Sequence, residues 1–235
     1  RNRTTLAVLA GLGFLLATSA NAAVDAAKAA QLGKNLTPVG AEKAGNGGAI
    51  PAWTGGVNKP IPGFKVGMFH PDPFASDKIV FTITPANYKQ YAANLSVGQI
   101  AMFEKYKTFK MNVYPTRRSA AFPQRTYDFT FKNATTCTLV ANGEGVKNCA
   151  EGLPFPIPQN GFEVIWNHKL KYKGVSFSRF ASQAAPSASG AFTLTAIRED
   201  GLGLYYKPGN TSANINDILL YFKQEVLSPA RLAGQ

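Results

Sequence analysis

From residue 79 onward the chain consists largely of short runs in which β-branched and aromatic residues alternate with polar ones. Runs of this kind, separated by turn residues, are typical of antiparallel strands. Helix signals precede or interrupt them, so the order of elements predicts an α+β fold, with one large curved antiparallel sheet and helices on one face. The expected strands are 79–83, 109–114, 125–131, 137–141, 175–181, 191–198, 202–206 and 218–226.

Three short helices are predicted among these strands. Pro85 fits the first turn of a helix that extends to about residue 93. Ser96 and Gln99 form a capping-box pattern, which predicts a second helix whose apolar face covers a sheet. Asn160 and Glu163 start the third helix in the same way. Its apolar residues have the spacing of a buried face: Phe162, Ile165, Trp166 and Leu170.

The first 22 residues have the pattern of a secretory signal peptide. Arg1 and Arg3 precede an apolar run of about a dozen residues, and small residues surround the expected cleavage site after Ala22. The run is too short to cross the ~30 Å hydrocarbon core of a bilayer as a helix. There is no cysteine near Ala22 to carry a lipid anchor. We therefore expect an exported, soluble, non-lipidated protein of the periplasm.

Residues 23–64 differ in composition from the strand-rich remainder. Residues 23–32 are rich in alanine and predict a short helix, whereas 33–64 are rich in Gly, Pro and Asn and cannot form a regular core element. We call 33–64 the strap, because its apolar residues are spaced like the anchors of an extended segment that wraps a domain. Residues 65–235 are expected to form a single α+β domain. The anchors of the strap are Ile50, Trp53, Val57, Ile61 and Phe64.

The chain is strongly basic, with a formal charge of +12, or +10 without Arg1 and Arg3. Outside the cytoplasm such a protein meets lipid headgroups and lipopolysaccharide, so peripheral contact with an anionic membrane surface is one expectation. A nucleic-acid partner is not expected, because the sequence carries no nucleic-acid-binding motif. The alternative is that the charge serves solubility alone.

Cys137 and Cys149 flank a turn-rich segment between two strand-like runs. An exported compartment permits disulfides, so we predict a Cys137–Cys149 bridge that closes a hairpin. Metal binding by this pair would need further ligands, and neither His70 nor His168 lies at a ligand spacing from it.

Motifs of known catalytic chemistry are missing from the sequence. There is no nucleophile elbow, P-loop, dinucleotide fingerprint or zinc motif, so we expect neither an enzyme nor a cofactor or metal site. The acidic pair Glu199 and Asp200 precedes Gly201 and is interpreted as a turn. An envelope hydrolase that uses His168 or a carboxylate pair is the remaining catalytic alternative.

Four strings of residues together resemble one family: 36–46, 50–56, 114–118 and 154–168. They resemble a proteobacterial exported family of unknown function whose members are described as outer membrane lipoprotein-sorting proteins. The resemblance implies a relative of the LolA/LolB-like carriers, with an incomplete β-barrel that holds acyl chains, and a gene context beside RND-type exporters. Members of that family are usually about twice as long, which implies that this chain is a truncated member lacking C-terminal strands.

The leading functional hypothesis is a periplasmic carrier that shields a lipid or another hydrophobic ligand in a groove of the sheet. Arg117 and Arg118 follow a proline turn and are candidates for contact with an anionic headgroup, although they are equally able to pair with acidic residues of the protein. A non-catalytic docking module for an envelope transporter is the alternative. The candidate groove residues, each of which could instead be core packing, are Phe129, Phe131, Phe177, Phe180, Phe192, Tyr221 and Phe222.

Overall fold

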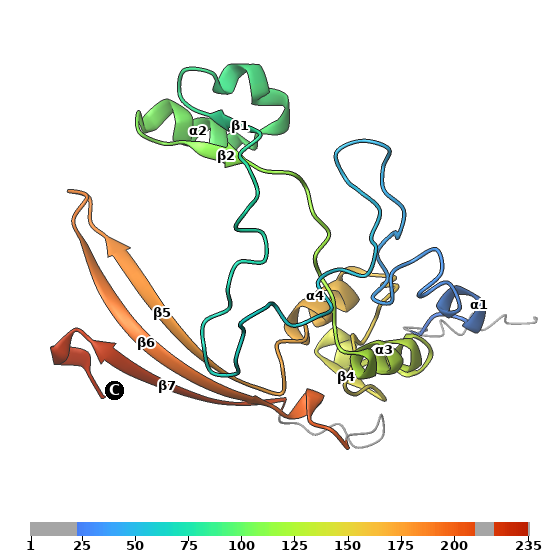
Figure 1. The fold of residues 1–235 in the computed structure, drawn as a ribbon. Coiled ribbons are helices and arrows are strands. Elements are labelled where there is room, and N and C mark those ends of the chain that lie inside the picture. The colour runs from blue at the N-terminus through green and yellow to red at the C-terminus, as the bar shows by residue number, and fades with distance from the viewer. Residues whose placement is uncertain (1–22, 210–218, 235) are drawn as a thin grey trace, which may run out of the picture.

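The computed structural model describes residues 23–209 and 219–234 (Figure 1). The predicted signal peptide, 1–22, lies outside the described residues, as does the first residue of the strand predicted at 218–226. The α+β class with antiparallel sheets is confirmed. The helices are α1 (Ala26–Ala29), η1 (Tyr88–Asn94), α2 (Val97–Lys105), α3 (Gln124–Thr136), η2 (Ala141–Gly143), α4 (Gly161–Lys169), η3 (Leu204–Tyr206) and η4 (Ala230–Leu232), and the strands are β1 (Phe81–Ile83), β2 (Met111–Val113), β3 (Thr138–Val140), β4 (Gly145–Lys147), β5 (Ser176–Pro186), β6 (Phe192–Gly203) and β7 (Leu220–Ser228).

The expected single large sheet is wrong. The described strands form two hairpins, β1-β2 and β3-β4, and one three-stranded sheet in the order β5-β6-β7. Helices do not cover a face of the three-stranded sheet; α3 and α4 lie at one of its ends, and the rest of the sheet extends away from them (Figure 1). The reason is that the apolar side of α4 is used against the β3-β4 hairpin and the end of the sheet, where Trp166 and Leu170 share one buried cluster with Tyr205 and Tyr206.

Strand β6 is continuous, so the predicted break after residue 198 and the predicted turn at Glu199 and Asp200 are wrong. Both acids are paired across the strands: Glu199 with Arg179, and Asp200 with Ser178 on β5. Because each acid has a partner on the neighbouring strand, both can lie within β6, and no turn is needed to expose their charges to water. Gly201 is also not a turn residue, because the ring of Phe177 lies where its side chain would be.

Helix α3 replaces the strand predicted at 125–131. Alternation of aromatic residues suggested a strand, yet the buried face of α3 is formed by the small or polar residues Thr126, Thr130, Asn133 and Ala134. The 150–153 segment lies directly against the α3 backbone, because a Cβ added to Gly152 would lie 2.3 Å from the backbone nitrogen of Thr130. Hydrophobic periodicity cannot detect a helix that is buried through such residues.

Helix α4 begins at the predicted cap, with the Asn160 side chain accepting from the Glu163 backbone, but its buried face differs from the prediction. Glu163 is fully buried because its carboxylate accepts from the Gln159 backbone at 2.6 Å and from the Asn160 amide at 2.9 Å. This rotation keeps Trp166 and Leu170 inside and leaves Phe162 and Ile165 each 57% exposed.

A small lobe, residues 81–113, has a core of its own at a distance from the other helices (Figure 1). Phe103 and Tyr88 stack there beneath the β1-β2 hairpin. The predicted capping box is confirmed, because Ser96 accepts from the Gln99 backbone and the Gln99 side chain accepts from the Ser96 backbone. The helix expected at 85–93 is the 3-10 helix η1.

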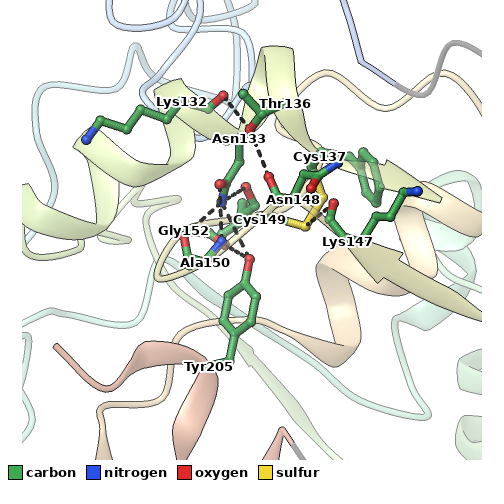
Figure 2. Close-up of a disulfide and its surroundings, with 12 residues drawn as sticks. Lys132, Asn133, Thr136, Cys137, Lys147, Asn148, Cys149, Ala150, Gly152 and Tyr205 are labelled. Atoms are coloured by element: carbon green, nitrogen blue, oxygen red, sulfur yellow. Dashed lines mark hydrogen bonds between the residues drawn. A yellow bond between two sulfur atoms is a disulfide. The ribbon is translucent and has the colours of Figure 1, made fainter. Parts of the chain in front are cut away.

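The predicted disulfide is confirmed and belongs to a polar network that joins α3 to the end of the sheet (Figure 2). The Asn133 amide donates to the carbonyls of Ala150 at 3.1 Å and Leu153 at 3.2 Å, and it accepts from the Ala150 backbone at 3.3 Å. The Tyr205 hydroxyl donates to the Gly152 carbonyl at 2.7 Å. The network thus fixes η3, and with it the start of the open sheet.

Candidate functional site

A hollow of about 170 Å³ lies where the three-stranded sheet meets α4. The network around Asn133 positions its floor, because Tyr205 and Tyr206 belong to η3 and both are buried. Phe177 comes from strand β5, and Leu219 is the residue immediately before β7. We call this the basal hollow; it is lined by Lys169, Leu170, Lys171, Lys173, Gly174, Phe177, Gly203, Tyr205, Tyr206, Leu219 and Leu220.

The basal hollow combines an apolar interior with a cationic rim. Burial raises the pKa of Tyr206, so its hydroxyl is neutral and donates to the Leu170 carbonyl at 2.5 Å. The positive charge comes from Lys169, Lys171 and Lys173, which are exposed. An apolar floor beneath ammonium groups has the chemistry to hold a molecule with an acidic head and a hydrocarbon tail.

A second hollow, of about 570 Å³, lies between the strap and α3. Its aromatic lining is Trp53 from the strap with Tyr127 and Phe131 from α3, and Gln124 and Asp128 are polar residues at its edge. The Gln124 amide donates to the Asp128 carboxylate at 2.9 Å, so these two groups are paired with each other. We call it the strap hollow.

The two arginines proposed for headgroup contact are engaged within the protein. Arg117 forms a salt bridge with Asp77, and this hydrogen bond lowers the pKa of the Asp77 carboxyl. Arg118 donates to three successive backbone carbonyls of the strap, at residues 42–44. Their observed role is therefore to hold extended segments of the chain in place.

Removing the Arg118 guanidinium should loosen the strap. Arg118 and the Trp53 indole, which donates to the Ala120 carbonyl at 2.9 Å, join the strap to the segment before α3. We expect Arg118→Ala to speed proteolytic cleavage within residues 42–53 severalfold and to shift Trp53 fluorescence to the red, because the backbone there becomes accessible. Lys110→Ala, an exposed control outside this contact, should change neither measurement. Unchanged cleavage in the Arg118 variant would contradict this role.

Comparison with known proteins gives a family for the chain. Residues 82–235 match the family model described as protein of unknown function DUF1329. The chain belongs to this family. The basal hollow, residues 169–220, lies wholly inside the part that matches the DUF1329 model, whereas Trp53 of the strap hollow lies outside it.

A curated relative of this DUF1329 chain is an uncharacterized protein, PA3922, of Pseudomonas aeruginosa. It is 45% identical over 225 residues, which cover 94% of this chain and 49% of the relative. The chain thus spans about half the length of the curated relative that it matches. No solved structure matches it.

The seven predicted groove residues do not meet in one place in this DUF1329 protein. Phe129 and Phe131 lie on the helix α3 and not on a strand. Phe177 and Phe222 pair with the same residue of β6, Gly201, and so share one face of the three-stranded sheet. By the same alternation the remaining three lie on the opposite face: Phe180, Phe192 and Tyr221.

The lysines of the basal hollow are functional candidates that the sequence patterns do not group together. Lys169 ends α4, with its ammonium 4.0 Å from the Trp166 ring centroid, whereas Lys171 and Lys173 follow in an extended segment. Their spacing at every second residue is visible in the sequence. The three lysines form a rim only because η3 and the end of the sheet pack against that segment.

Within 23–209 and 219–234, no group of three or more His, Cys, Asp or Glu residues gathers that could hold a metal ion. Over the same ranges, no helix has the length and apolar character needed to cross a membrane.

Proposed function

We propose that the chain is a periplasmic, non-catalytic binding or carrier module for a hydrophobic ligand with an acidic head. The observation that carries the proposal is the basal hollow, in which Lys169, Lys171 and Lys173 surround an apolar floor. A carboxylate or phosphate at the rim would pair with the lysines, and the hydrocarbon part would contact Phe177 and Leu220.

The face of the sheet next to the basal hollow supports a ligand longer than the hollow itself. Leu220 and Phe222 are two residues apart on β7, and Phe177 pairs across Gly201 with Phe222, so all three lie on one face. Leu220 is 48% exposed and Phe222 is 52% exposed. An acyl chain could therefore continue from the hollow along this face.

The proposal places the chain among carriers related to LolA and LolB, working beside an RND-type exporter in the envelope. Within the described residues the antiparallel sheet of β5, β6 and β7 does not close into a barrel, which is compatible with part of such a carrier. The Cys137–Cys149 disulfide fits an oxidising compartment, which supports export to the periplasm. In this view the sequence before Ala23 is a cleaved signal peptide, and the chain corresponds to about half of the carrier.

A docking module for an envelope transporter is the second candidate, and the strap hollow favours it. Trp53, Tyr127 and Phe131 line an open apolar surface of the kind that receives an extended, proline-rich segment of a partner. This candidate needs no small ligand, so ligand content separates it from the carrier.

The carrier proposal is tested by ligand content and by a single change in the basal hollow. The chain is expressed with an initiator Met in a Gram-negative host, purified from the periplasm, extracted with organic solvent and analysed by lipid mass spectrometry. We expect stoichiometric acidic lipid. Leu220→Gln should weaken binding of a fluorescent fatty acid about tenfold, because it removes apolar contact that contributes ~1.5 kcal/mol or more.

Leu194→Gln is the matched control for this variant. Leu194 is 51% exposed, close to the 48% of Leu220, and lies on the same sheet but on the opposite face and away from the hollow. It should bind the fatty acid like the unmodified chain. A folded protein that carries no lipid and takes up no fatty acid would refute the carrier and favour the docking module.

A further inference from the structure

Helix α4 presents an apolar face to solvent. Phe162, Val164 and Ile165 are 57%, 52% and 57% exposed, whereas Glu163 and Trp166 are buried on the other side of the helix. With one residue every 100° around a helix, Val164 and Ile165 lie opposite the buried side. Val164 and Ile165 are thus held outward on a helix whose orientation is fixed by its buried residues, and the half-exposed Phe162 ring, which packs on Gly143, flanks them.

Positive charge adjoins this face. Lys169 ends α4 on its exposed side, and Lys171 and Lys173 follow within four residues. In the described part of the chain every ion pair uses an arginine, and these lysines form none. We call the six residues the α4 face: Phe162, Val164, Ile165, Lys169, Lys171 and Lys173.

We infer that the α4 face docks on an anionic membrane surface. Outward apolar side chains beside lysines are the arrangement of helices that lie in the headgroup region, where apolar groups enter the acyl boundary and ammonium groups meet phosphates. The patch is one short helix face, whereas a stable protein partner commonly covers ~800 Å². Charge complementarity and this small extent therefore favour a lipid surface over a protein.

Docking through the α4 face goes beyond the carrier function, because it does not require the basal hollow to be filled. The two features nevertheless share the three lysines, which rim the hollow. A lipid surface held at α4 would lie beside the opening, at the place where a ligand with an acidic head enters or leaves.

Flotation with vesicles tests the docking. The purified chain is mixed with vesicles of phosphatidylcholine alone, or of equal parts phosphatidylcholine and phosphatidylglycerol. We expect binding to the anionic vesicles only, and loss of binding when salt rises from about 0.1 M to about 1 M, which shortens the Debye length from about 10 Å to about 3 Å. Val164→Gln with Ile165→Gln should weaken binding about tenfold or more, because apolar burial is lost. Gln is a better helix former than Val or Ile, so α4 should persist.

A charge variant with a matched control separates the α4 face from the general basicity of the chain. Replacing Lys169, Lys171 and Lys173 by Gln should weaken binding about a hundredfold, since each lysine near an anionic leaflet contributes about fivefold. The control removes the same charge from the distant lobe and should weaken vesicle binding far less, because the contribution of a lysine falls off within a Debye length of the leaflet, about 10 Å at 0.1 M salt. It replaces Lys89, Lys107 and Lys110, all exposed, by Gln.

Three results would overturn the inference: no binding to anionic vesicles, equal losses in the two lysine variants, or a dimer in light scattering that Ile165→Gln converts to a monomer. The last would assign the face to a second copy of the chain. Failure of the carrier function has a different signature, because vesicle binding would persist while the purified chain held no lipid. The Val164 and Ile165 variant, whose changes lie outside the hollow, should keep its bound lipid.

Discussion

Asn133→Ala is expected to lower the free energy of unfolding by about 3 kcal/mol or more, because it leaves the Ala150 N–H and the carbonyls of Ala150 and Leu153 without their Asn133 partner in a buried site. Asn133 is only 1% exposed, so water cannot replace it without opening the network of Figure 2. The truncation also leaves a small cavity next to Gly152. The loss is measured from urea unfolding followed by circular dichroism.

Thr135→Ala on the same helix is the control. Thr135 is exposed, and its hydroxyl donates locally to the Lys132 carbonyl at 3.2 Å. A surface change of this kind should alter the free energy of unfolding by no more than about 0.5 kcal/mol. If the two alanine variants unfold at the same urea concentration, the network does not stabilise the junction of α3 and the sheet.

Loss of the disulfide should cost about 3 kcal/mol, because the bridge joins residues 12 apart and restricts the unfolded chain. Both sulfur-bearing residues are fully buried, so the double variant Cys137→Ala and Cys149→Ala also loses packing against Trp166 and Leu170. The thermal midpoint of the variant should fall by several degrees for a domain of this size, roughly 2–4 °C per kcal/mol.

Reductant provides the control for the disulfide. It should lower the midpoint of the unmodified chain and leave that of the double variant unchanged, because the variant has no bridge to reduce. Loss of the bridge, by reduction or in the double variant, should also weaken fatty-acid binding. The bridged hairpin carries the Gly143 carbonyl, which accepts from the Trp166 indole at 2.9 Å and so positions α4 beside the basal hollow. A midpoint that reductant does not move would contradict a stabilising bridge.

Sequence patterns predicted the elements whose signals are local. The capping box of Ser96 and Gln99, the N-cap at Asn160, the disulfide hairpin and the approximate positions of β1, β2, β3, β5 and β7 depend on neighbouring residues and are found where they were expected. Patterns failed where tertiary contacts reverse the usual preference. Helix α3 is buried through Thr130 and Asn133, whose polar groups are satisfied by the 150–153 segment, and no periodicity of apolar residues marks such a face.

The candidate site was predicted only in part, for the same reason. Phe177 and Phe222 were expected in a groove and share one face of the sheet, but Phe129 and Phe131 were assigned to a strand that is a helix. The basal hollow needs Tyr206 of η3 to meet the end of α4, a contact between residues 36 apart in the chain. Only the folded arrangement brings such groups together.

The far end of the three-stranded sheet has a consequence for how the molecule unfolds. Strand β7 pairs with β6 only as far as Ala196, so residues 183–186 and 192–195 continue as a two-stranded ribbon without a third described strand. Ribbons of two strands are marginally stable in water. Amide protons of the ribbon should therefore exchange with solvent through frequent local opening, whereas those beside Gly201 exchange only when the junction with η3 opens. A single global unfolding midpoint would therefore report the junction and would not detect the opening of the ribbon.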